Sequence, residues 1–412
     1  MSKVIYRLYL ILLSLWFLTT FATFFDMSQH NRLLSSVADD GTRVSSDFAL
    51  FYCAGSLSRT DPVAVYDQQQ FSQFVKESFA PLNISGVYQM QYPPHYLFPF
   101  AILSYLPMQT AWFLKSFVDL LFATGAAFLL TSKAKERAAS VAAFLILLFS
   151  SFPAWICVRS GQFSFSLLFA LSLFFYFLKE QRVKLMSMIL PFIKLQYVPA
   201  IAATGLSFGK LHFLQTAMIA VLAIVAISIL LVGWQNFLDI PAAIFKHQTN
   251  DQLTGAVPGI MQNFRGALVA ISGQDNRNIL LGSLLAWLAS LAAIAYLWMK
   301  KYPVMKANSA AYSEELCMSI SILLMLGFSL NTYVYDYVAA IIPCYFLYCS
   351  MKDETASKLK AAAGFFFFGF PVFSWVMSSF LFTGSPVRFL LPPMFVWNMI
   401  LLMLLIIRIN RN

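Results

Sequence analysis

The residues of this chain that could do chemistry are acids and bases set among apolar neighbours. Asp47 follows Ser46 and directly precedes the apolar run 48–55. An acid flanked by aromatic residues at a membrane edge could have a raised pKa and act as a general base. An aspartate before an apolar run is also a common helix N-cap. The residues around Asp47 leave both interpretations open.

A lysine in an apolar stretch is the second candidate. Lys194 lies between Pro191 and Pro199, and these prolines interrupt the segment. Ionisable groups at membrane depth are costly, so they are functional candidates by default. Lys194 could bind a phosphate, or it could extend its side chain toward the membrane surface.

Two further cations fall in or beside apolar segments. Arg159 precedes Gly161 and Gln162. An arginine can bind phosphate oxygens through two hydrogen bonds, although a plain interfacial arginine fits nearly as well. Lys115 and Asp119 are four residues apart on one expected helix, and this spacing favours an internal ion pair.

The composition places these residues in a membrane. Of the 412 residues, 59% are hydrophobic and 11% are charged, whereas a soluble domain carries about a quarter charged residues. Apolar runs at 8–25, 118–131 and 389–407 are near the length that crosses a bilayer. The first run has no small-x-small cleavage pattern after it, so we interpret it as a retained anchor.

The formal net charge of +10 orients the chain in the membrane. Basic residues cluster in short stretches between apolar segments, as in cytoplasmic loops. These clusters are near residues 133–137, 179–184, 300–306, 352–360 and 408–411. We therefore expect both termini in the cytoplasm, two long periplasmic loops at about 26–92 and 234–277, and no nucleic-acid partner.

The apolar pattern predicts an all-α polytopic membrane protein, with one integral membrane domain over 1–412. We expect about ten full spans and two short or broken segments, a re-entrant run at 96–106 and a broken hairpin at 184–210. Phe71, Phe74, Val75 and Phe79 share one face of a helix expected at 67–79. This helix could lie on the bilayer surface or pack on the protein.

Several spaced segments resemble glycosyltransferase family 87, the polyprenyl-phosphate mannosyltransferase-like group. They appear in the family's order over about 47–343. The segments are Ser46-Asp47-Phe48 with Tyr52 and Ala54-Gly55; Val65-Tyr66-Asp67; Tyr92-Pro93-Pro94; Gly161-Gln162; the break at Lys194; Asn263-Phe264-Arg265-Gly266; and Ser329-Leu330-Asn331 with Tyr335-Asp336-Tyr337.

The resemblance implies a GT-C fold of ten to twelve transmembrane or re-entrant helices in the bacterial inner membrane, with its active site on the periplasmic face. It implies an inverting transfer of one mannose-like hexose or pentose from a polyprenyl-phosphate donor to a lipid or glycan hydroxyl. No cofactor and no metal are implied. Asp47 takes the role of the base. The phosphate-binding candidates are Lys194, Arg159 and Arg265, and the sugar or acceptor contacts are Tyr52, Tyr92, His95, Gln162, Asn263, Asn331, Tyr335 and Asp336.

The chain departs from the family at one segment. Actinobacterial members carry a histidine-rich stretch where this chain has Asn331 to Asp336. Two other functions stay open on the sequence. A transporter or flippase would be expected to show inverted repeats and paired broken helices, and only one broken segment is evident. A polysaccharide polymerase or ligase would share lipid-phosphate donors and long outer loops.

Overall fold

The computed structural model describes residues 11–15, 18, 34–37, 43–81, 83–84, 86–88, 90, 92–132, 134, 136–179, 194–207, 211–249, 261–307, 312–351, 358–382 and 392–411. All structural statements concern these residues. Most of the expected first span at 8–25 lies outside them. So does the first part of the expected broken hairpin at 184–210.

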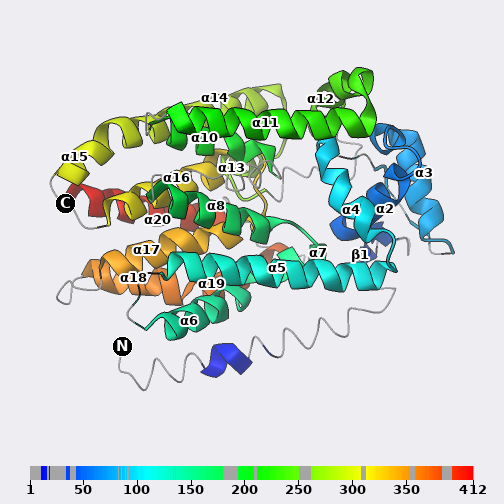
Figure 1. Ribbon diagram of the computed structural model, residues 1–412. Coiled ribbons are helices and arrows are strands. Elements are labelled where there is room, and N and C mark those ends of the chain that lie inside the picture. Colours follow the sequence, from blue (N-terminus) through cyan, green and yellow to red (C-terminus); the bar gives the residue numbers. More distant parts are fainter. Residues whose placement is uncertain are drawn as a thin grey trace.

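Long helices run side by side through most of the molecule, and a group of shorter elements packs at one end of them (Figure 1). We call this group the end layer. It consists of strands β1 (Leu34–Val37) and β2 (Arg43–Ser45), helices α2 (Asp47–Ser58), α3 (Gln68–Ser78) and α4 (Leu97–Leu103), and the 3-10 turns η2 (Ala64–Tyr66) and η3 (Pro94–Tyr96). The strands form a two-stranded antiparallel sheet beside the helices.

The remaining elements form the helical body. They are α5 (Met108–Leu130), α6 (Arg137–Phe149), α7 (Phe152–Ser160), α8 (Ser164–Lys179), η5 (Leu195–Tyr197), α10 (Val198–Ser207), α11 (Leu211–Val232), α12 (Trp234–Thr249), α13 (Phe264–Ser272), α14 (Arg277–Tyr296), the π-helix η7 (Leu297–Lys301), α15 (Tyr302–Ala307), α16 (Ser313–Phe328), the 3-10 helix η8 (Val334–Ala340), α17 (Ile341–Ser350), α18 (Lys358–Phe368), α19 (Phe370–Phe382) and α20 (Pro393–Arg411). The expectation of a helical membrane protein is confirmed.

Four helices of the described residues are long and apolar enough to cross a membrane, and the number rises to six if two bent helix pairs each count as one span. The apolar runs at 138–156 and 358–381 each predict one continuous helix, and both helices are instead bent. The first bends by 68° between α6 and α7, where the Ser151 side chain caps a new helix that carries Pro153 in its first turn. The second bends by 63° between α18 and α19, at Gly369.

Helix α5 has its apolar side chains exposed and its charged side chains buried, the reverse of a surface helix in a soluble protein. Phe117 and Leu121 are 55% and 54% exposed, whereas Lys115 and Asp119 are 6% and 3% exposed. Apolar side chains on the outside and charges on the inside are what a lipid environment requires. The exposed face of α5 therefore faces the lipid tails.

The end layer packs around a second hydrophobic core, to which residues of α5, α11 and α12 also contribute. Phe71 and Val75 of α3 are buried in this core, so the amphipathic helix packs on the protein. Asp67 caps α3 by accepting hydrogen bonds from the backbone of residues 69 and 70. Helices α2 and α4 approach closely at Gly55, where a Cβ atom would lie 2.3 Å from the Phe100 carbonyl.

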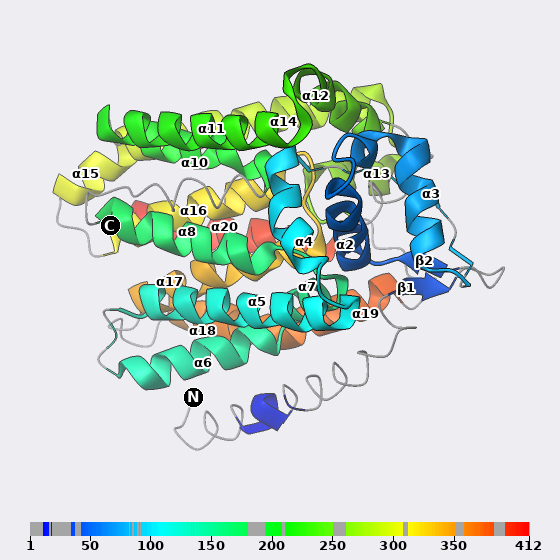
Figure 2. The ribbon, with the colours of Figure 1, turned by 45° about the vertical axis from the view of Figure 1, so that its right-hand side comes forward.

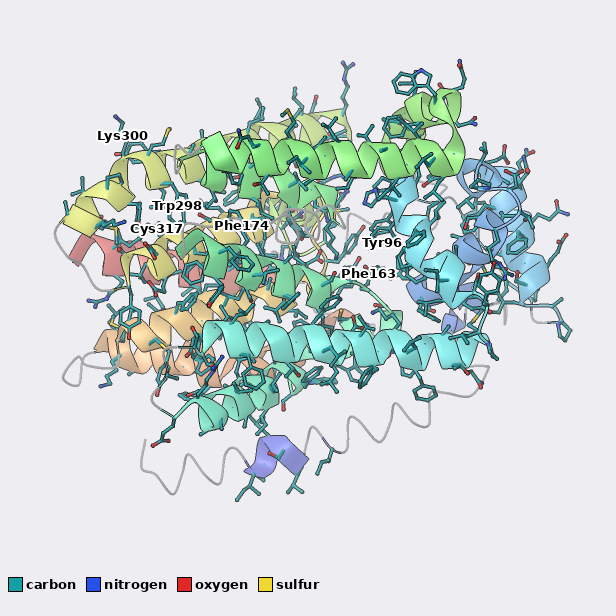
Figure 3. All side chains as sticks on the ribbon, viewed as in Figure 1. Tyr96, Phe163, Phe174, Trp298, Lys300 and Cys317 are labelled. Atoms are coloured by element: carbon teal, nitrogen blue, oxygen red, sulfur yellow. The ribbon has the colours of Figure 1, made fainter. Side chains whose placement is uncertain are left out.

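The end layer lies at one end of the molecule, and basic residues lie at the other. Figure 2 shows α2, α3 and the two strands gathered at one end, while α15 lies at the other. In Figure 3, Lys300 lies at the end that holds α15, and Tyr96 and Phe163 lie close together near the end layer. The end layer therefore sits opposite one of the basic clusters of the sequence.

Candidate active site

Asp47 is the first residue of α2, but it does not cap this helix. The hydroxyl of Ser46 accepts the backbone N–H of Ala49, which is the contact of an N-cap residue. The capping interpretation of Asp47 is therefore unnecessary, because the preceding serine fills that role. The Asp47 side chain is only partly exposed, and Phe48 beside it is fully buried.

The turn between α7 and α8 supplies the direct partner of this carboxylate. Nε2 of Gln162 donates to Oδ2 of Asp47 at 2.7 Å. Helix α7 ends at Gly161 in the left-handed conformation, with φ of 74°, and the Gln162 N–H returns to the Cys157 carbonyl. A Cβ at Gly161 would lie 2.3 Å from Cβ of Phe48, so the turn packs directly against the start of α2.

Behind this turn lies the ion pair expected on α5. Nζ of Lys115 is 2.6 Å from Oδ2 of Asp119. The same nitrogen donates to the backbone carbonyl of Gln162 at 2.5 Å. It also lies 5.3 Å from the ring centre of Phe163. The internal pair predicted from the spacing is confirmed, and it extends to the turn that holds Asp47.

Lys194 is fully enclosed and forms an ion pair with Asp336. The Ser164 hydroxyl bridges the two groups: it donates to Asp336 at 3.0 Å and accepts from Lys194 at 3.3 Å. The other oxygen of Asp336 accepts the backbone N–H of Tyr333 at 3.2 Å. Nζ of Lys194 also lies 4.6 Å from the ring centre of Tyr335. Residues 194 and 336 thus join two irregular backbone segments inside the helical body.

Arg265 holds a similar position on α13. Its guanidinium pairs with Asp275 at 2.6 Å and donates to the side-chain oxygen of Asn331 at 3.3 Å. Asn263 caps α13 by accepting the Gly266 N–H, and its amide donates to the Ser329 carbonyl at 2.7 Å. Asn263 therefore joins α13 to the segment after α16.

Arg159 differs from the other two expected phosphate-binding cations. It is partly exposed near the end of α7, and its guanidinium lies 5.0 Å from the ring centre of Trp155. It has no carboxylate partner among the described residues. Within that part of the chain, no neighbouring acid balances its positive charge.

Aromatic rings line the region between α2 and the turn before α8. Tyr92 stacks on Tyr96 at 4.4 Å and meets the edge of Phe51 at 5.2 Å. Its hydroxyl is 3.5 Å from Oε1 of Gln162, a long contact. Phe163 meets Tyr96 at 4.7 Å, as Figure 3 also shows.

Two expected contact residues lie to the side of this cluster. The hydroxyl of Tyr52 donates to the Leu106 carbonyl at 2.7 Å and so anchors α2 to the turn before α5. His95 lies in η3, with its ring edge-on to Tyr96 at 6.4 Å. Tyr52 therefore supports the position of α2, and the hydrogen bond to Asp47 itself comes from Gln162.

The surroundings of Asp47 change its acidity in two opposite ways. Burial raises its pKa above the ordinary value, and this effect is the largest. The Gln162 hydrogen bond and the positive charges of Lys194 and Lys115 act against it. Burial likewise raises the pKa of Tyr92 well above its usual range, so that this phenol stays protonated. A carboxylate with a raised pKa is suited to accept a proton.

Ser164 and Asp275 also lie in this polar cluster, and no pattern in the sequence singles them out. A serine at the start of an apolar helix is common, and only the position of Asp336, 172 residues further on, gives Ser164 its role. Asp275 follows the end of α13 and reaches Arg265 through a turn. Within the described part of the chain, there is no group of three or more His, Cys, Asp or Glu side chains that could hold a metal ion.

Apolar outer faces, several spanning helices and a buried polar cluster at one end define a polytopic membrane protein with an internal site. The model of glycosyltransferase family 87 matches residues 90–326, more than half of the chain, and the chain belongs to this family. It is a membrane glycosyltransferase of the GT-C type. Comparisons with curated proteins and with solved structures found no match.

The family match and the polar cluster overlap only in part. Gln162, Lys194 and Arg265 lie within the matched residues, whereas Asp47 precedes them and Asp336 follows them. Hydrogen bonds nevertheless join Asp47 to Gln162, and an ion pair joins Asp336 to Lys194. The site is thus assembled from both sides of the matched segment.

Proposed function

We propose that this glycosyltransferase moves one sugar from a polyprenyl-phosphate donor to a hydroxyl of a lipid or glycan acceptor, with inversion, at the outer face of the membrane. Asp47 acts as the general base. The observation that carries this proposal is the state of the Asp47 carboxylate: one oxygen is held by Gln162, the helix cap is supplied by Ser46, and burial raises the pKa.

The second oxygen of Asp47 is available for the acceptor. Oδ1 has no hydrogen-bond partner among the described residues, whereas Oδ2 is fixed by Gln162. In the proposed step, the acceptor oxygen attacks the anomeric carbon while its proton passes to Asp47. The bond between the anomeric carbon and the phosphate oxygen breaks, and the polyprenyl phosphate leaves with the electron pair. Attack from the face opposite the leaving group inverts the anomeric configuration.

The leaving phosphate needs a positive charge that is not already balanced. Lys194 and Arg265 are each paired with a buried or partly buried carboxylate. Arg159 is stacked on Trp155 and has no such partner in the described residues. We therefore assign donor phosphate binding first to Arg159. Lys194 and Arg265 organise the segments that carry Asp336 and Asn331, and Lys194 adds positive charge near Asp47.

A transfer assay with matched aspartate variants tests the base. The purified enzyme receives polyprenyl-phosphate mannose or, in parallel, polyprenyl-phosphate arabinofuranose, with extracted membrane lipids as acceptor. Asp47→Asn should lower kcat by about a hundredfold or more, because the amide cannot accept the proton. Asp67→Asn is the control: it makes the same change at another helix start of the end layer, and asparagine caps a helix as well as aspartate does.

The expected result is loss of transfer in Asp47→Asn, with unchanged thermal unfolding and full transfer in Asp67→Asn. Full transfer by Asp47→Asn would remove Asp47 as the base. Movement of the lipid-linked sugar across the membrane without any transfer product would favour a flippase.

A further inference from the structure

The Lys115–Asp119 ion pair on α5 is energetically costly to bury, and the proposed transfer step does not use it directly. Lys115 and Asp119 are both buried on the inner face of a helix whose outer face carries exposed apolar side chains. Ion pairs inside membrane proteins are costly to build and tend to mark functional sites. The pair therefore calls for a specific explanation.

The geometry of Lys115 supplies one. Its ammonium group donates to Oδ2 of Asp119 and, at 2.5 Å, to the backbone carbonyl of Gln162. The side chain of the same Gln162 donates to Asp47 at 2.7 Å. Lys115 of α5 therefore binds the backbone of Gln162, and the side chain of Gln162 binds the Asp47 carboxylate on α2.

The Gly161–Gln162 turn needs such an anchor. Among the described residues, the carbonyl of Gln162 otherwise accepts a hydrogen bond only from the Cys157 thiol, at 3.4 Å, and a thiol is a weak donor. Gly161 is in the left-handed conformation, which leaves the local backbone with little steric preference. A charged donor fixes the carbonyl more strongly than a neutral one.

We propose that Lys115, held in place by Asp119, is a positioning residue for the transfer reaction. It fixes the Gly161–Gln162 turn so that the Gln162 amide meets the Asp47 carboxylate. This inference rests on the proposed role of Asp47 as the base. Lys115 does not contact the reacting atoms; it acts through Gln162.

The pH dependence of transfer separates positioning from simple structural support. The charged and titratable groups that interact electrostatically with Asp47 are Lys115, Lys194, Tyr92 and Tyr335, and Gln162 binds it directly. Asp336 is the ion-pair partner of Lys194. The Gln162 hydrogen bond and the Lys115 charge both lower the pKa that burial has raised. A base works above its pKa and stops as the pH falls through it. Loss of Lys115 should therefore move the acidic limb of the rate profile to higher pH.

The decisive variant removes both charges. Lys115→Met/Asp119→Leu leaves no unpaired buried charge, and replacement of a buried pair by apolar residues is often neutral for stability. We expect kcat/KM at neutral pH to fall on the order of tenfold, and the acidic limb to move to higher pH. Lys115→Gln is the second variant, should the double variant fail to fold, and the same direction is expected.

The matched control removes a buried hydrogen bond far from the site. In Ser321→Ala the Trp298 indole loses its 2.9 Å bond to Ser321. Figure 3 places Trp298 away from Tyr96 and Phe163. This variant should unfold at a somewhat lower temperature and keep the acidic limb of the parent enzyme.

A double-mutant comparison tests the route through Gln162. In Gln162→Met there is no amide to position, so adding Lys115→Met/Asp119→Leu should cause much less than the tenfold loss seen in the parent. Equal losses in both backgrounds, or an acidic limb that stays in place, would overturn the positioning role. Full transfer by Asp47→Asn would instead overturn the proposed function itself, so the two failures are distinguishable.

Discussion

The three cations expected to bind phosphate fall into two groups at the scale of single residues. Lys194 and Arg265 each have a carboxylate partner, and Lys194 is fully enclosed with Asp336. Arg159 is partly exposed and rests on an indole ring. Removal of one member of a buried ion pair leaves the other charge unpaired in an apolar interior. Removal of an exposed cation leaves no unpaired buried charge.

This difference predicts opposite consequences for Lys194 and Arg159. Lys194→Met should lower the free energy of unfolding by about 3–5 kcal/mol, because Asp336 is left unpaired. Lys194→Met/Asp336→Leu should recover most of that loss. Arg159→Gln should change the stability by less than about 0.5 kcal/mol and raise the KM for the polyprenyl-phosphate donor roughly tenfold.

Thermal unfolding in detergent and donor-saturation kinetics measure these two quantities. A stable and fully active Lys194→Met variant would show that the pair with Asp336 is not needed. An unchanged donor KM in Arg159→Gln would contradict the assignment of the phosphate to Arg159.

At the scale of elements, the site depends on how closely α2 approaches the turn after α7. Gly161 and Gly233 both have positive φ, of 74° and 78°. A Cβ at Gly161 would lie 2.3 Å from Cβ of Phe48, whereas nothing lies within 4 Å of a Cβ at Gly233. A substitution at Gly233 therefore measures the cost of backbone strain alone. A substitution at Gly161 adds the steric contact with Phe48, which positions Asp47.

Gly161→Ala should displace the start of α2 and reduce transfer by at least tenfold, beyond the cost of the left-handed backbone. Gly233→Ala should cost about 1–2 kcal/mol of stability from the backbone conformation alone and retain near-normal transfer. Unfolding and kcat/KM are measured for both. Similar activity in the two variants would show that the contact with Phe48 does not control the site.

At the scale of the whole molecule, the end layer and the basic end lie apart, with the lipid-facing helices between them. The positive-inside pattern predicts that the end layer is outside and that the lysines near η7 are in the cytoplasm. Glu77 of α3 and Lys301 of η7 are both exposed and mark the two ends. Cysteine labelling at these positions measures the orientation.

A membrane-impermeant maleimide added to intact cells should label Glu77→Cys and not Lys301→Cys. Permeabilised cells should be labelled at both positions, which controls for reactivity. The native cysteines of the described structure contribute little, because four of the five are buried. The reverse labelling pattern would place the site on the cytoplasmic side, where nucleotide-linked donors are available.

Local patterns in the sequence are enough to predict the spanning helices. The apolar pattern predicts a helix at 108–131 and a span at 211–232. The structure has α5 at Met108–Leu130 and α11 at Leu211–Val232. The amphipathic helix at 67–79 and the Lys115–Asp119 pair are also found. These features are set by residues within a turn or two of one another, so apolar period, caps and i,i+4 spacing suffice to predict them.

The sequence by itself thus determined that the chain is a helical membrane protein with an acid of interest at Asp47. Only the tertiary structure decided which partners the charges have. Gln162 reaches Asp47 over 115 residues, and Lys194 meets Asp336 over 142. No local signal encodes such separations, because the partners are chosen by how the end layer packs on the helical body and by the cost of leaving any buried charge unpaired.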